Sequence, residues 1–112
     1  MGAITIEPFK RKALEINGEA YELLATDIEI LEMMAEFEAS HKALAKKNPA
    51  PGEVAEGYAK VARGFDRMLG ESALAKIMGT DRLPGHKLVE AFQKVSQEAL
   101  RLYEEDVRRA YE

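Results

Sequence analysis

The first part of the chain alternates apolar and polar positions on either side of the dipeptide Asn17-Gly18. A two-residue type I′ turn needs positive φ at both central positions, which Asn and Gly adopt more easily than other residues. Folding about this turn puts four apolar side chains on one face: Leu14, Ile16, Tyr21 and Leu23. A lone hairpin is marginally stable in water, so this face is expected to pack on helices.

A shorter alternation stands ahead of the hairpin. Ile4-Thr5-Ile6 is β-branched throughout, and Pro8 ends the run. These residues favour an extended strand. We therefore predict a strand and hairpin segment over residues 1–24 and a helical body over residues 26–112.

From Thr26 onward the apolar spacing changes from two to three and four, which is typical of helices. Thr26 and Glu29 form a capping-box pattern, and the sequence from 48 to 52 contains two prolines and a glycine. The first helix is predicted at about 27–46. Its apolar positions predict a broad buried stripe: Ile28, Ile30, Leu31, Met34, Ala35, Phe37, His41 and Leu44.

Three more helices are predicted, at about 53–69, at 71–78 with Ser72 near its start, and from 84–86 to the C-terminus. Gly57 and Gly64 lie inside the second of these helices, which indicates close approach of a neighbouring helix. The fold class is predicted to be mainly α (α+β). We expect a single domain, residues 1–112, in which an N-terminal β-hairpin packs on a compact bundle of about four helices, the last one long. Five apolar residues spaced by threes and fours predict the core face of the second helix: Val54, Tyr58, Val61, Phe65 and Leu69.

Composition narrows the function classes. The 112 residues include 16 Lys and Arg and 20 Asp and Glu, a net charge of −4, and the basic residues are scattered. Nucleic-acid binders need a concentrated positive surface, so no nucleic-acid partner is expected. The chain has no cysteine, which excludes disulfides and thiolate chemistry. No apolar run approaches the roughly 20 residues of a membrane span, so no membrane partner is expected.

The candidate chemistry is sparse. Glu38 and His41 have the Glu-x-x-His spacing of di-metal helices, but the second such pair is missing because His86 is the only other histidine. Ser72 lies in neither a Gly-x-Ser-x-Gly nor a Ser-x-x-Lys motif, and we expect it to cap the short helix. The sequence predicts no catalytic residue, no metal ligand and no cofactor.

The last helix changes its apolar face near its end. The core stripe runs through Leu102 and then meets Asp106, where the next apolar residue is due. Tyr103, Val107 and Tyr111 form a second stripe, rotated around the helix, and are the candidate partner-binding residues. The alternative is that they fold back on the hairpin or simply lie exposed. Three i,i+4 ion pairs are predicted along this helix: Glu90 with Lys94, Glu104 with Arg108, and Glu105 with Arg109.

Residues 64–79, GFDRMLGESALAKIMG, followed by Asp81 and Arg82 and a helix, resemble the tail assembly chaperones of long-tailed (siphovirus-type) phages of Gram-positive bacteria. Those proteins often carry an aspartate, two residues, Leu-Gly-Glu-Gly, a small residue, two residues and Lys-Ile-Phe-Gly after a helical region. They also tend to open with a strand-rich segment similar to residues 14–23. Ser72 stands where that pattern has a glycine or small residue, and Met78 stands where it has Phe.

The resemblance implies a non-enzymatic protein of the host cytoplasm that is absent from the mature virion. It would bind the tape-measure protein and recruit tail-tube subunits during tail assembly. Separately from the resemblance, a small domain with a spare apolar stripe is consistent with a homo-oligomer. Many such proteins have a second form, extended near the C-terminus by a ribosomal frameshift. Two alternatives remain open: a structural head–tail or tail component retained in the virion, and a small helical DNA-binding regulator.

Overall fold

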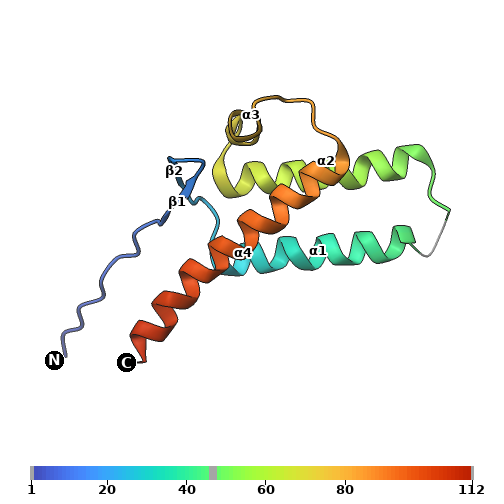
Figure 1. The fold of residues 1–112 in the computed structure, drawn as a ribbon. Coiled ribbons are helices and arrows are strands. Elements are labelled where there is room, and N and C mark those ends of the chain that lie inside the picture. The colour runs from blue at the N-terminus through green and yellow to red at the C-terminus, as the bar shows by residue number, and fades with distance from the viewer. Residues whose placement is uncertain (1, 46–47, 112) are drawn as a thin grey trace.

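A computed structural model describes residues 2–45 and 48–111 (Figure 1). The predicted architecture is confirmed: a two-stranded hairpin precedes four helices, and the last helix is long. The elements in chain order are β1 (Ala13–Ile16), β2 (Glu19–Glu22), α1 (Asp27–Ala45), α2 (Pro51–Leu69), α3 (Ala73–Met78) and α4 (Gly85–Ala110).

The hairpin forms in the register that the sequence predicts. Asn17 and Gly18 have φ of 52° and 81°, as a type I′ turn requires, and Leu14 pairs with Tyr21. Leu14 and Leu23 are buried in the common core. The turn also docks on α3, because the Asn17 side-chain amide donates a hydrogen bond to the Ile77 carbonyl oxygen at 3.3 Å.

The expected strand at residues 4–6 is wrong. Residues 2–12 form no strand, and Ile4 and Ile6 are exposed. An extended segment becomes a strand only when another strand supplies backbone hydrogen bonds, and the hairpin does not pair with this one.

The capping box of α1 is confirmed. The Glu29 backbone N–H donates to the Thr26 hydroxyl, and the Thr26 N–H donates to the Glu29 carboxylate, both at 3.2 Å. The predicted buried stripe is too broad, however. Ile30 and Met33 are buried, whereas Ile28 and Leu31 are 65% and 54% exposed, because the neighbouring helices cover only one side of α1. The predicted contribution of Leu44 lies outside the described side chains, and residue 46, the predicted helix end, lies outside the described residues.

Gly64 allows α1, α2 and α4 to approach one another, as its place inside a helix indicates. A Cβ at Gly64 would lie 3.3 Å from both the Met33 sulfur and the Phe92 ring. Around this crossing the largest core side chains are fully buried, among them Phe65, Met68 and Ile30. The crossing is the centre of the core.

The corner, residues 64–79, turns the chain from α2 into α3. Gly70, Ser72 and Gly79 have φ of 94°, 71° and 77°, in the left-handed region that glycine adopts most easily. Ser72 lies near the start of the short helix, as predicted, and occupies the N-cap position of α3, which begins at Ala73 rather than at residue 71. The expected capping hydrogen bond is wrong, because the Ser72 side chain makes none.

The long helix α4 overhangs the body. Tyr103 is its last buried residue, so seven residues continue beyond it, about 10 Å at 1.5 Å per residue. Residues 2–12 project in the same direction, and the two ends of the chain lie at the same extremity of the molecule (Figure 1). We call residues 3–12 together with residues 104–111 the terminal arm.

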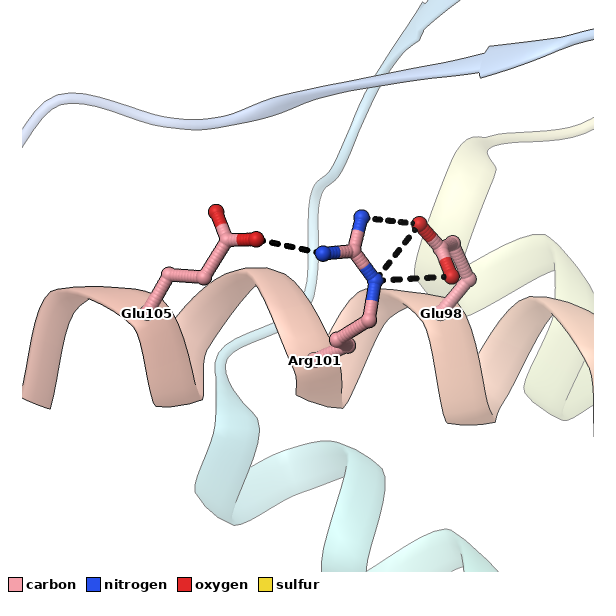
Figure 2. A network of polar contacts seen from close by, with 3 residues as sticks. All are labelled: Glu98, Arg101 and Glu105. Atoms are coloured by element: carbon pink, nitrogen blue, oxygen red, sulfur yellow. Dashed lines mark hydrogen bonds and ion pairs between the residues drawn. The ribbon is translucent and has the colours of Figure 1, made fainter. Parts of the chain in front are cut away.

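Of the ion pairs predicted on α4, the one between Glu90 and Lys94 is present at 3.0 Å. The other two are wrong. Arg101 lies between Glu98 and Glu105 and binds both carboxylates (Figure 2). Glu105 therefore pairs with Arg101, one turn earlier in the helix, rather than with Arg109.

Candidate functional site

A concave surface lies between the C-terminal half of α1, the N-terminal half of α2 and the start of α4. This cavity of ≈ 550 Å³ opens to solvent, and we call it the α4-side groove. Its apolar lining consists of Phe37, Ala45, Val54, Tyr58, Val61 and Val89, and its polar rim includes Ser40, His41, His86, Glu90 and Gln93.

A second cavity of ≈ 490 Å³ lies along the opposite side of the α1 and α2 pair, and we call it the outer groove. Met33, Phe37, Val61 and Phe92 form its floor. Phe37 and Val61 line both cavities, so the two grooves are separated by little more than these side chains. The two helices thus leave apolar side chains accessible from both sides.

The rims of the grooves carry ion pairs with pKa consequences. Arg63, on the rim of the outer groove, holds the Glu56 carboxylate at 2.7 Å and keeps the pKa of Glu56 below its usual range. At the α4-side groove, Lys94 and Lys87 lower the pKa of Glu90. These carboxylates stay charged at neutral pH and mark a polar border around an apolar floor.

Tyr58 shapes the α4-side groove. Its ring lies against the start of α4, where a Cβ at Gly85 would come within 2.3 Å of the ring. Glycine at this position therefore lets α4 begin directly over Tyr58. The sequence pattern assigned Tyr58 to the core, but its side chain is 40% exposed, whereas Phe65 from the same pattern is fully buried. The sequence feature that could have predicted this groove is Gly85, because a glycine in the first turn of a helix indicates that another side chain packs closely against it.

The histidines lie on the rim of the same groove. His41 stacks on Phe37 with ring centroids 6.1 Å apart, and His86 lies at the start of α4. His41 is exposed rather than part of a buried stripe. Within residues 2–45 and 48–111 no group of three or more His, Cys, Asp or Glu side chains could hold a metal ion.

The three predicted partner-binding residues separate into two environments. Tyr103 is buried, and its hydroxyl donates a hydrogen bond to the Ala25 carbonyl oxygen at 2.8 Å. Burial raises the pKa of the Tyr103 phenol. Tyr103 thus folds back behind the hairpin, which leaves Val107 and Tyr111, 53% and 88% exposed, as the accessible members of the stripe.

In the described part of the chain, no helix has both the length and the apolar character needed to cross a membrane. Comparisons with protein-family models, with curated proteins and with solved structures found no match.

Proposed function

We propose that this chain is a non-enzymatic phage tail assembly chaperone, which binds the tape-measure protein and recruits tail-tube subunits. The proposal includes a location in the host cytoplasm and absence from the mature virion. It starts from the resemblance of residues 64–79 and of the hairpin segment to that family.

The backbone of the corner supports the resemblance. At residue 72, where the family pattern has a glycine or small residue, φ is 71°, and Gly70 and Gly79, which match glycines of the pattern, also have positive φ. A pattern of three residues in the left-handed region explains why glycine would recur at these spacings. Ser72 departs from the pattern in residue type, but its backbone adopts the same left-handed conformation.

The grooves supply a surface that fits such a role. A chaperone for an aggregation-prone protein must offer apolar surface to an apolar segment without itself aggregating. The α4-side groove has an apolar floor with charged and polar groups at its border, the arrangement by which amphipathic helices are held. We assign the tape-measure segment to this groove.

Co-expression tests the proposal. The tape-measure protein encoded near this chain should be insoluble alone and soluble with it. Val89→Lys places a charge in the groove and should abolish the rescue, whereas Gln97→Lys, an exposed position of α4 outside the groove, should not. Both variants must fold, which circular dichroism checks. If the wild-type chain leaves the tape-measure protein insoluble, the chaperone function is wrong.

Mass spectrometry of purified virions separates the chaperone from the structural alternative. The chaperone proposal expects no peptide of this chain in the particle. Stoichiometric recovery from virions would make it a tail or head–tail component instead.

A further inference from the structure

The terminal arm presents one helix face that nothing in the described chain covers. Glu104, Val107, Arg108 and Tyr111 are spaced i, i+3, i+4 and i+7, so they share one side of α4. All four are exposed. An apolar pair flanked by one acid and one base is the composition of a helix–helix contact.

The N-terminal segment lies on the neighbouring side of α4 and leaves this face open. Phe9 stacks on Tyr103 with ring centroids 6.4 Å apart, and Lys12 pairs with Asp106 at 2.7 Å. Asp106 lies away from Val107 and Tyr111 around the helix, and Tyr103 precedes Val107 by one turn at the edge of the face. The segment therefore contacts the edge of the face, and Val107 and Tyr111 remain 53% and 88% exposed.

The charges on the open face have no ion-pair partner within residues 2–45 and 48–111. Glu104 and Arg108 appear in no such ion pair, whereas the adjacent Glu105 is bound by Arg101 (Figure 2). An acid followed by a base four residues later is self-complementary when two copies of the helix run antiparallel.

The molecule also has more surface than its mass requires. Its accessible surface is 8326 Å², whereas a compact monomer of 12.5 kDa has about 6,200 Å². The radius of gyration is 16.9 Å, compared with about 13 Å for a compact chain of this length. The excess surface reflects the elongated shape of the chain, to which the projecting terminal arm contributes.

We propose that the partner of the terminal arm is a second copy of this chain, paired across a two-fold axis near Val107 with the two α4 ends antiparallel. Val107 of each copy lies beside Val107 of the other. Glu104 of each copy comes within one helical turn, about 5.4 Å, of the second copy's Arg108. Two turns of helix bury less than a standard interface, so the dimer is weak and depends on concentration.

Single-cysteine crosslinking tests this directly, because the chain has no cysteine of its own. Val107→Cys lies at the axis and should form a disulfide-linked dimer on mild oxidation. Arg109→Cys lies two residues along, on the far side of the helix, and should stay monomeric under the same conditions. Equal crosslinking of the two variants, or none of either, overturns the proposal.

Charge exchange tests the antiparallel direction. Arg108→Glu should weaken the dimer about tenfold by light scattering, since it replaces two attractive pairs with two repulsive ones. Adding Glu104→Arg in the same chain should restore the dimer. A double variant that stays as weak as the single variant overturns the antiparallel arrangement. Both tests use the purified chain alone, so their outcome is independent of the chaperone proposal.

Discussion

The corner and the terminal arm both combine apolar residues with Glu and Arg, but the corner buries its largest apolar side chains and the arm exposes them. In the corner, Phe65 and Met68 are fully buried, and the Met68 carbonyl accepts a hydrogen bond from the Leu24 N–H at 2.7 Å. In the arm, Val107 and Tyr111 face solvent. The corner is thus a packed region and the arm an exposed one, so we expect substitutions in the corner and core to change unfolding most, and substitutions in the arm to change mainly the proposed association of two copies.

The largest loss of stability is expected from a substitution at the crossing of α1, α2 and α4. Phe92 is buried between α1 and α2, and Phe92→Ala should destabilise the chain by about 3–5 kcal/mol through the cavity it leaves. The matched change in the arm, Val107→Ala, should stay within about 0.5 kcal/mol. Urea unfolding at low protein concentration measures both. Similar losses for the two variants would contradict the separation.

A smaller loss is expected where α4 begins. Gly85→Ala drives a Cβ into the Tyr58 ring and should cost about 1–3 kcal/mol through overpacking. The double variant with Tyr58→Ala should lose less than the sum of the two single variants, because the clash is then absent. Strict additivity in thermal or urea unfolding would show that the ring does not hold this position.

Tyr103 joins the two regions, and removing its hydroxyl tests which one it serves. Tyr103→Phe leaves the buried Ala25 carbonyl without its donor and should cost about 1–3 kcal/mol. Because the ring remains, crosslinking through Val107→Cys should be unchanged. A variant with wild-type stability and altered crosslinking would move Tyr103 from the core to the recognition surface.

The corner also offers a stabilising change. Ser72 holds φ of 71°, a conformation that costs an L-residue about 1–2 kcal/mol. Ser72→Gly should therefore raise stability by about 1 kcal/mol after the added chain entropy of glycine. Glu71→Gly, one residue earlier and without positive φ, should lower it. Equal effects of the two changes would show that the strain at Ser72 is absent in solution.

The smallest expected change in stability comes from Asp66, and it depends on pH. Burial, and secondarily Glu71, raise the pKa of Asp66 above its ordinary 3.8. The folded chain then binds this proton more tightly than the unfolded chain, so the contribution of Asp66 to stability is present at low pH and lost as pH rises through the folded value. Asp66→Asn should raise stability at pH 7 by at most about 0.5 kcal/mol, with no gain below the ordinary pKa.

Removing the charge of an aspartate in the arm should have the opposite effect on stability at pH 7. Asp106 pairs with Lys12 at 2.7 Å, so Asp106→Asn should lower stability at pH 7, by less than about 1 kcal/mol for a partly exposed pair. Urea unfolding of both variants at pH 7 compares the two, and the Asp66 variant is measured again below pH 3.8. A gain from Asp106→Asn or a loss from Asp66→Asn at neutral pH would contradict this assignment.

Local chemistry could be predicted from the sequence. The Asn17-Gly18 turn and the capping box of Thr26 and Glu29 are decided by residues within four positions of one another, and both are confirmed. The sequence predicts the end of one helix near residue 69 and the start of the next near residue 71, but serine gives no signal for the positive φ at Ser72.

Features that depend on distant parts of the chain could not be predicted. Ile4 and Ile6 have strand propensity but no strand pairs with them, and Ile28 lies on a side of α1 that no helix covers. Tyr103 binds a carbonyl 78 residues away, which no periodicity reveals. The groove at Tyr58 likewise depends on where α4 starts. Whether the open surfaces bind the partners proposed here stays a prediction.

The overhang of the arm has a hydrodynamic consequence. The molecule measures 63 Å along its longest axis and 32 and 24 Å across, so a single copy diffuses more slowly than a sphere of the same mass. Its elution volume on gel filtration should overstate its mass, and an elongated monomer should elute close to a compact dimer. Sedimentation velocity, which yields the frictional ratio together with the mass, distinguishes a stretched single chain from a pair.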